Sequence, residues 1–175
     1  MLDLQTRRLY MQPIRETDWP LFSTLHQQPE VIRYLFDETT LEQTRERFES
    51  RLPAWTLDSS HWLCLVIRER QTQAPLGVTG LKLSEHSASE AEVGYLLLHE
   101  HQGKGYGSES LRALTDYASQ TLGIKTLFAT VTDGNTASCK VLEKCGYVFA
   151  KRQPLAYQLR GEAVDDLIFR WRASP

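Results

Sequence analysis

Three glycines alternate in the segment Gln102-Gly103-Lys104-Gly105-Tyr106-Gly107-Ser108, which lies between an expected strand and an expected helix. Glycine removes the Cβ atom that would keep a ligand away from the backbone. Successive backbone N–H groups at a helix N-terminus, helped by the helix dipole, form a site for an anion such as a pyrophosphate. The segment therefore predicts a phosphate-binding loop, with an ordinary glycine-rich turn as the alternative.

Two well-known phosphate loops do not fit this segment. The dinucleotide-binding pattern G-x-G-x-x-G requires a third glycine where Ser108 stands, and it normally follows the first strand of a parallel unit. The pattern G-x-x-x-x-G-K-[ST] is absent. The pattern that is present is Q-x-x-G-x-G, formed by Gln102, Gly105 and Gly107.

A second group of polar residues lies just before this loop. Glu92 falls on an expected strand over residues 92–98, where its carboxylate could accept a proton or hold a cationic group. A solvated carboxylate at a strand start is the alternative, and His99, Glu100 and His101 compete for the same role. The spacing of these histidines does not match H-E-x-x-H, so we expect no metal site.

Composition indicates one globular domain over residues 1–175 and excludes several classes of protein. With 41% apolar residues and 10% aromatic residues, the chain can bury a core, so disorder is not expected. A pI near 6.2 argues against a nucleic-acid binder. Three cysteines without a C-x-x-C pair suggest neither a disulfide framework nor a zinc site. No apolar stretch is long enough for a membrane span and no signal peptide begins the chain, so we expect a cytoplasmic protein.

Local charge is uneven although the net charge is only −2. Residues 85–101 carry a net charge of −4, and residues 102–175 carry a net charge of +3. This arrangement suits a protein that brings a cationic group to an anionic one, and on charge alone the favoured alternative is ordinary scatter of surface charge.

The elements that must position these residues alternate along the second half of the chain. Four helices are expected: one begins at Asp18, one runs from Thr40 towards Leu52, one ends at Gly123, and one runs from Asn135 to Gly146. Strands are expected over residues 8–14, 62–67, 76–83, 92–98, 125–131, from 147, and over 163–171, with turns at 71–75 and 86–89. Strands 92–98 and 125–131 enclose a helix and must be parallel, whereas the earlier strands form antiparallel hairpins. The expected fold class is mixed α/β (α+β).

The pattern Q-x-x-G-x-G resembles the acyl-CoA loop of the GCN5-related N-acetyltransferase (GNAT) superfamily. The chain is also similar to its ribosomal-protein alanine N-acetyltransferase branch at residues 6–14, 28–35, 92–95, 135–138 and 142–147, in the same order. This resemblance implies one acetyltransferase domain. It also implies the GNAT fold, a mostly antiparallel twisted sheet with one splayed parallel strand pair, flanked by helices.

The resemblance implies acetyl-CoA as cosubstrate and no metal. It implies that backbone groups of the loop hold the pyrophosphate, and that freed backbone groups at the end of strand 92–98 bind the pantetheine arm. It also suggests that Asn135 hydrogen-bonds this arm, while a helix cap alone is the alternative for that residue. The cofactor-binding candidates are Leu96, Leu97, Leu98, Gln102, Gly103, Lys104, Gly105, Tyr106, Gly107, Ser108 and Asn135.

The resemblance also assigns candidate proton carriers. Many members place a tyrosine seven residues after the asparagine, but Leu142 stands there and cannot donate a proton. Ser138 is therefore the candidate donor to the leaving thiolate, with a solvated first-turn serine as the alternative, and Glu92 is the candidate general base. Tyr147 has a suitable phenol but is interpreted as a core residue. The resemblance also implies an acceptor pocket in the region 17–57. Its candidates are Trp19, Tyr34, Phe36 and Trp55, with a position in the core as the favoured alternative for each.

The expected function is acetyl-CoA-dependent transfer of an acetyl group to a primary amine, preferably the N-terminal amine of a protein or peptide. Transfer to a small amine such as a polyamine, amino sugar or amino-acid derivative is the alternative within enzymes. A non-catalytic acyl-CoA-binding module and a nucleotide-binding module are alternatives of other classes. We expect neither nucleic acid nor membrane as a partner, and the sequence leaves monomer and homodimer open.

Overall fold

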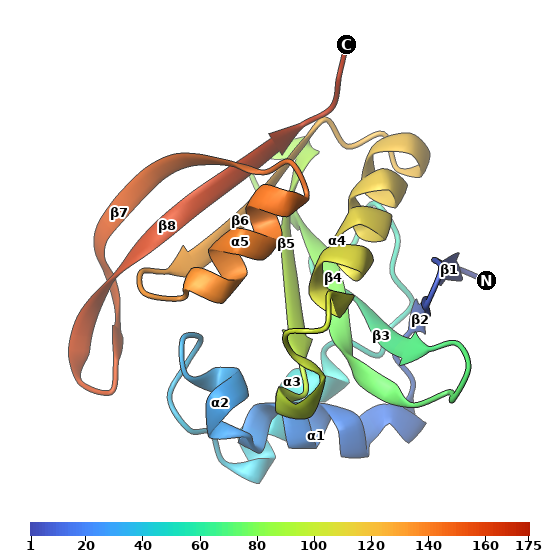
Figure 1. Ribbon diagram of the computed structural model, residues 1–175, viewed down its shortest axis with the longest axis horizontal. Helices are drawn as coiled ribbons and strands as arrows, with labels where there is room; N and C mark the ends of the chain where they lie inside the picture. Colours follow the sequence, from blue (N-terminus) through green and yellow to red (C-terminus); the bar gives the residue numbers. More distant parts are fainter.

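The computed structural model describes residues 1–175, which form one eight-stranded sheet with the order β1-β2-β3-β4-β5-β6-β8-β7 (Figure 1). Its strands are β1 (Leu4–Gln5), β2 (Leu9–Pro13), β3 (Leu63–Glu69), β4 (Pro75–Ser84), β5 (Ser87–Leu97), β6 (Thr126–Thr132), β7 (Val148–Leu159) and β8 (Glu162–Arg172). The α-helices are α1 (Trp19–Gln27), α2 (Pro29–Ile32), α3 (Leu41–Glu49), α4 (Tyr106–Asp116) and α5 (Thr136–Lys144). Short 3₁₀ segments occur at η1 (Glu16–Asp18) and η2 (His99–His101), and a π-helical segment, η3 (Tyr117–Thr121), extends α4.

The parallel pair β5–β6 is the feature of the sheet that matters most for a ligand. All other neighbouring strands are antiparallel. The two strands pair only at Glu90–Thr126, Ala91–Leu127 and Glu92–Phe128, and beyond that point they separate. The crossover through α4 makes the pair parallel, because its strands are joined by a helix rather than a tight turn. The expected mostly antiparallel sheet with one splayed parallel pair is confirmed.

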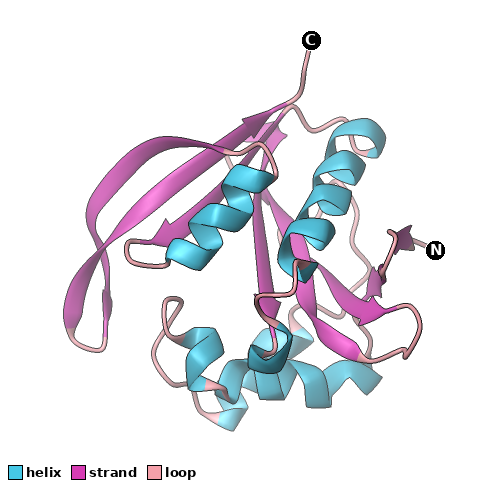
Figure 2. Cartoon of the chain, viewed as in Figure 1, coloured by secondary structure: helices cyan, strands magenta, loops and turns pink.

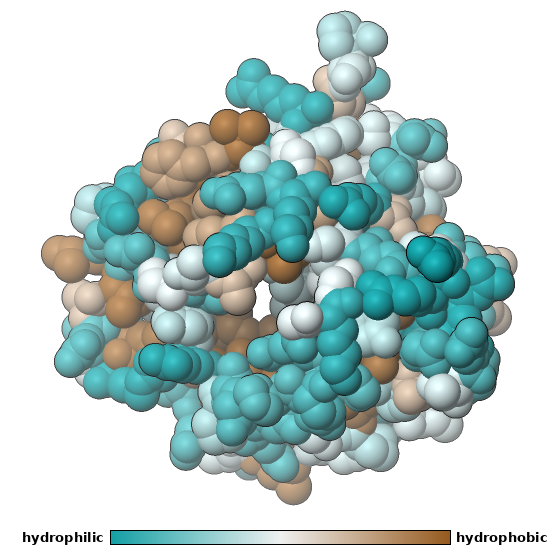
Figure 3. Space-filling view, viewed as in Figure 1, coloured by the Kyte–Doolittle hydropathy of each residue, from teal (hydrophilic) through white to brown (hydrophobic).

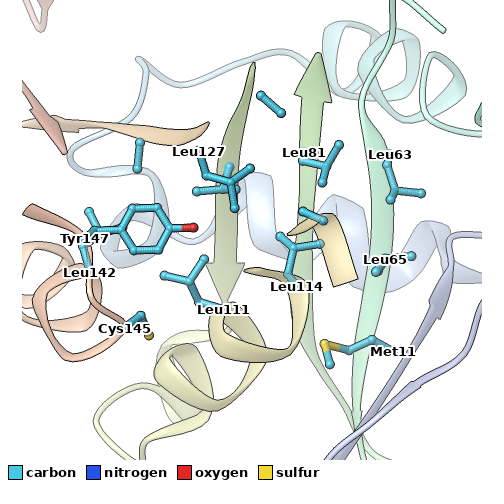
Figure 4. Close-up of a cluster of buried hydrophobic side chains, with 14 of the residues drawn as sticks. Met11, Leu63, Leu65, Leu81, Leu111, Leu114, Leu127, Leu142, Cys145 and Tyr147 are labelled. Atoms are coloured by element: carbon cyan, nitrogen blue, oxygen red, sulfur yellow. The ribbon is translucent and has the colours of Figure 1, made fainter. Parts of the chain in front are cut away.

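Helices cover both faces of the sheet. Figure 2 shows α4 and α5 side by side on one face, with α1, α2 and α3 gathered at the lower end of the molecule. The larger core cluster lies between the sheet and the α4–α5 layer. Figure 4 shows its labelled members Met11, Leu63, Leu65, Leu81, Leu111, Leu114, Leu127, Leu142, Cys145 and Tyr147. A second cluster joins Phe22 of α1 and Phe48 of α3 to the opposite face of β3 and β4. No helix is both long enough and apolar enough to cross a membrane.

The structure corrects several expected boundaries. The helix expected to run towards Leu52 ends at Glu49. The turn expected at residues 86–89 lies at residues 85–86 instead, and β5 already begins at Ser87. The serines in this stretch suggest a turn locally, but tertiary pairing overrides that preference. Ser87 pairs with Ser84 of β4, and the Ser89 carbonyl accepts a hydrogen bond from Lys125 N–H at 2.9 Å. The two-residue strand β1 was not expected.

Candidate active site

The glycine loop has a backbone conformation that suits an anion site. Gly103 and Gly105 have φ angles of +74° and +84°, a left-handed region that favours glycine, and Gly105 is the N-cap residue of α4. The Gln102 side-chain amide donates a hydrogen bond to the Leu97 carbonyl at 3.1 Å, which ties the loop to the end of β5. The eleven-residue helix α4 thus begins directly behind the loop and directs its free N–H groups out of the helix start.

A cleft of about 1160 Å³ opens in front of this loop, between α5, the end of β5 and the segment 29–38. Figure 3 shows the hollow near the middle of this face. The volume slightly exceeds the ~300–1,000 Å³ of ordinary small-ligand sites, so a large ligand or two ligands together can be accommodated. The predicted site residues that line the cleft are Leu96, Leu97, Gln102, Gly103, Gly105, Gly107, Ser108, Asn135 and Ser138.

The remaining predicted residues, Leu98, Lys104, Tyr106 and Glu92, do not line the cleft. The Leu98 N–H donates a hydrogen bond to the Leu76 carbonyl at 2.9 Å, so this group faces β4 rather than the opening. Backbone groups alternate between the two edges of a strand, and those of Leu97 therefore face the opening. The Lys104 carbonyl and the Tyr106 ring both contact Arg8, on the outer side of the loop.

A tyrosine–serine pair lies in the cleft where β5 separates from β6. The hydroxyl groups of Tyr95 and Ser138 are 2.8 Å apart. Burial raises the pKa of Tyr95 to about 12, so its phenol remains protonated at neutral pH. Alternation along the strand puts Tyr95 on the same face as Val93 and Leu97, but nothing in the sequence signals that it meets a residue 43 positions later.

The residues around this pair fit the interpretations made from sequence. Leu142 is fully buried, and the Tyr147 phenol lies 2.8 Å from the Thr115 hydroxyl in the core. Asn135 caps α5, because its side-chain oxygen accepts the Ser138 N–H at 3.3 Å. Since Asn135 also lines the cleft, the cap leaves room for a second role.

Glu92 occupies the last position at which β5 pairs with β6, where it lies opposite Phe128, and on its other side it pairs with Lys82 of β4. Strand alternation turns it to the face opposite Tyr95. Burial raises the pKa of Glu92, while the Thr130 hydroxyl and the Lys82 charge oppose that rise. Asp166 of β8, which the sequence did not single out, is close enough to raise the pKa of Glu92 further, and its own Oδ1 is buried without a hydrogen-bond partner.

The end of the cleft remote from the glycine loop is formed by segment 33–38 and the β7–β8 hairpin. Asp37 accepts the backbone N–H of Arg160 at 2.7 Å, and the Arg160 guanidinium donates to the Arg33 carbonyl at 3.0 Å. Tyr34 and Phe36 line the cleft as expected. Trp19 and Trp55 do not line it: Trp19 packs against Phe48 of α3, and Trp55 packs against the larger core cluster.

The model of the acetyltransferase (GNAT) domain family matches residues 8–148, which include the loop, the splayed strands and most of the cleft. The chain belongs to this family. The resemblance inferred from sequence is thereby confirmed, and the protein is an acetyltransferase of GNAT type.

Individual GNAT proteins match over most of the chain. An uncharacterized N-acetyltransferase, p20 of Bacillus licheniformis, is 26% identical over 149 residues, which are 84% of this chain and 83% of that protein. The solved spermidine N-acetyltransferase of Vibrio cholerae, in complex with CoA and spermine, is 18% identical with a TM-score of 0.82, covering 95% of this chain and 96% of that one. The RimL ribosomal-protein α-N-acetyltransferase, solved with coenzyme A, is 19% identical with a TM-score of 0.80, covering 98% of both chains. At these identities the two solved structures establish the fold alone.

Proposed function

We propose that the protein uses acetyl-CoA to acetylate a primary amine, preferably the N-terminal amine of a protein or peptide. One observation carries the proposal: a single cleft contains both the glycine loop at the N-terminus of α4 and the Tyr95–Ser138 pair at the strand opening. The first feature suits a pyrophosphate and the second suits a leaving thiolate. The RimL structure, whose name specifies a protein α-amine, supports the choice of acceptor.

The loop residues Gly103 to Ser108 would hold the pyrophosphate through their N–H groups, and Leu97 and Asn135 would bind the pantetheine arm. The Leu97 N–H is the suitable donor, because the Leu97 carbonyl already accepts a hydrogen bond from Gln102. Acetyl-CoA supplies an acetyl thioester, which a neutral amine can attack. The protein must therefore take a proton from the amine and give one to the sulfur.

Ser138 supplies the second proton. If Tyr95 donates its hydrogen bond to Ser138 Oγ, the Ser138 hydroxyl hydrogen is free to point into the cleft. Because burial keeps the Tyr95 phenol protonated, that donor persists across the neutral pH range. Proton transfer from a positioned group contributes roughly 10²–10⁴-fold to a rate.

Glu92 accepts the proton of the amine, through water, from the other face of the sheet. Its raised pKa brings the carboxylate closer to neutral pH, where a general base is most effective. Its position at the point where β5 and β6 part places it beside the opening rather than among the residues that line the cleft.

Acetyl transfer from acetyl-CoA to a panel of peptides with free N-termini tests the proposal. We expect turnover with at least one peptide, a loss of about 10²-fold in kcat for Ser138→Ala and a smaller loss for Tyr95→Phe, with CoA affinity preserved. Ser50→Ala is the matched control, because Ser50 follows the last residue of α3, its hydroxyl donates to the Arg47 carbonyl at 2.6 Å, and it does not line the cleft. Absence of turnover with every peptide would reject this acceptor. Thermal stabilisation by NAD or ATP but not by CoA would reject the cosubstrate.

A small polyamine is the second candidate acceptor. Glu92 and Asp166 place two carboxylates on one face beside the strand opening, and residues 85–101 carry a net charge of −4. The fold similarity to spermidine N-acetyltransferase is in line with this choice. Spermidine belongs in the same acceptor panel: faster turnover of spermidine than of any peptide, together with loss of that preference in Asp166→Asn, would favour the polyamine.

A further inference from the structure

An arginine from the N-terminal strand region lies against the outer side of the glycine loop. Arg8 Nη1 donates a hydrogen bond to the Lys104 carbonyl at 3.0 Å, and its Cζ atom lies 4.5 Å from the centre of the Tyr106 ring. A Cβ atom placed on Gly105 would be 3.1 Å from Arg8 Nη2, so the guanidinium fits closely against a residue that has no side chain. Arg8 therefore contacts three successive loop residues from the side away from the cleft.

The side chain of Arg8 is itself held in place. Its Nε atom is 2.7 Å from Glu109 Oε2, and its backbone N–H donates to Glu109 Oε1 at 2.8 Å. The Thr6 hydroxyl donates to the same Oε1 at 2.6 Å. Glu109 belongs to the first turn of α4, so the carboxylate joins the start of that helix to the residues that precede β2.

These contacts fix the direction of one peptide group in the loop. A trans peptide is planar, and its C=O and N–H bonds point in opposite directions. Since the Lys104 carbonyl is directed at Arg8, the Gly105 N–H is directed the other way, towards the cleft that Gly103 and Gly105 line. A flipped peptide would instead present a carbonyl oxygen to an anion and repel it.

We propose that Arg8 is a positioning residue for the phosphate loop: it holds the Lys104–Gly105 peptide with its N–H group facing the bound pyrophosphate. The proposal rests on the proposed use of acetyl-CoA. Arg8 acts through the loop rather than as a phosphate ligand, because the Glu109 carboxylate already neutralises its charge at 2.7 Å.

Binding of CoA and of pantetheine, which lacks the pyrophosphate, tests the proposal in Arg8→Ala. Loss of one charge-assisted hydrogen bond that orders the loop should weaken CoA binding about tenfold. Pantetheine affinity should remain unchanged, whereas general damage to the fold would weaken both ligands. Arg8→Lys should recover part of the loss, because an ammonium group can still donate to the Lys104 carbonyl.

Glu109→Gln distinguishes two possible roles of Arg8, because the two roles predict opposite changes in CoA affinity. If Arg8 bound phosphate directly, removal of a nearby negative charge would strengthen CoA binding. If Arg8 positions the loop, loss of its anchor should weaken CoA binding. Glu109→Gln also serves as the second variant if Arg8→Ala does not fold.

Arg45→Ala is the matched control, because Arg45 also pairs with glutamates and lies over the aromatic ring of Trp19, but on α3, away from the loop. This variant should bind CoA like the wild type. Equal loss of CoA and pantetheine in Arg8→Ala, unchanged CoA affinity in that variant, or tighter CoA binding in Glu109→Gln would each overturn the proposal. Failure of the wild type to bind CoA would instead reject the proposed function and this inference with it.

Discussion

The stability of the protein should fall as the pH drops below neutral because of His26, a histidine of α1 that is only 3% exposed. Its Nδ1–H donates to the Phe22 carbonyl at 2.8 Å, and its ring stacks against Phe22 and Phe36 at centroid distances of 4.2 and 5.4 Å. Burial lowers the pKa of His26 from 6.5 to about 4, and the nearby charges of Arg47 and Arg51 act in the same direction.

The direction of this pH effect depends on whether the unfolded or the folded state takes up a proton at the higher pH. In the unfolded chain His26 titrates near its ordinary pKa of 6.5, whereas in the folded protein the ring stays neutral down to about 4. Stability is therefore fully present above that ordinary pKa and is lost as the pH falls towards the folded value. At about pH 5 the difference in proton uptake corresponds to about 2 kcal/mol of unfolding free energy.

Urea unfolding at about pH 8 and about pH 5 measures this loss. With an m-value of roughly 2 kcal/mol/M, the wild-type midpoint should shift by about 1 M. The useful quantity is the difference between wild type and His26→Leu, because other groups also titrate in this range. The variant should lose about 2 kcal/mol less than the wild type over the same interval. His61→Gln, which removes an exposed imidazole, is the control. An identical pH dependence in wild type and His26→Leu would refute the reasoning.

Three further changes have expected outcomes. Gly80→Ala should destabilise by about 3 kcal/mol or more and lower Tm or abolish soluble expression, because its Cβ would lie 1.8 Å from the Leu63 carbonyl; an unchanged melt would contradict this. Thr40→Ala removes the hydroxyl that accepts the Gln43 N–H at 3.1 Å, so Tm should fall by roughly 2–4 °C, and Thr40→Ser should restore it. The Cys64 thiol, whose pKa burial raises to about 12, should react with a thiol reagent only after unfolding; rapid labelling of the native protein would show otherwise.

The loop and the strand pair around it could be predicted from sequence because their signals are local. The glycine spacing at residues 103–107 and the helical periodicity after it define a strand–loop–helix unit within thirty or so residues. The connection through a helix then requires a parallel pair, and the structure confirms it. The part of the site that would bind a phosphate could therefore be predicted from a short-range sequence pattern.

The contacts that complete the site could not be predicted, since each joins segments that are distant in sequence. Tyr95 and Ser138 are 43 residues apart, and Arg8 and Glu109 are 101 residues apart. No spacing rule connects such positions; only the register of the sheet and the packing of helices bring them together. The orientation of the Leu98 N–H towards β4 could not be predicted for the same reason. The sequence shows that groups alternate along a strand, but it does not show which edge of the strand a given backbone group faces.

The two ends of the cleft are held in place by residues from opposite ends of the chain. The loop is braced by Arg8 near the N-terminus, whereas the opposite end is closed by Arg160 of the C-terminal hairpin, which contacts Asp37 and Arg33. Segment 33–38 and the hairpin tip consequently form one unit that must be exchanged together in a chimeric protein, because replacing either alone would break the contacts between them. A different version of this end of the cleft could then be grafted onto the molecule without redesigning the loop.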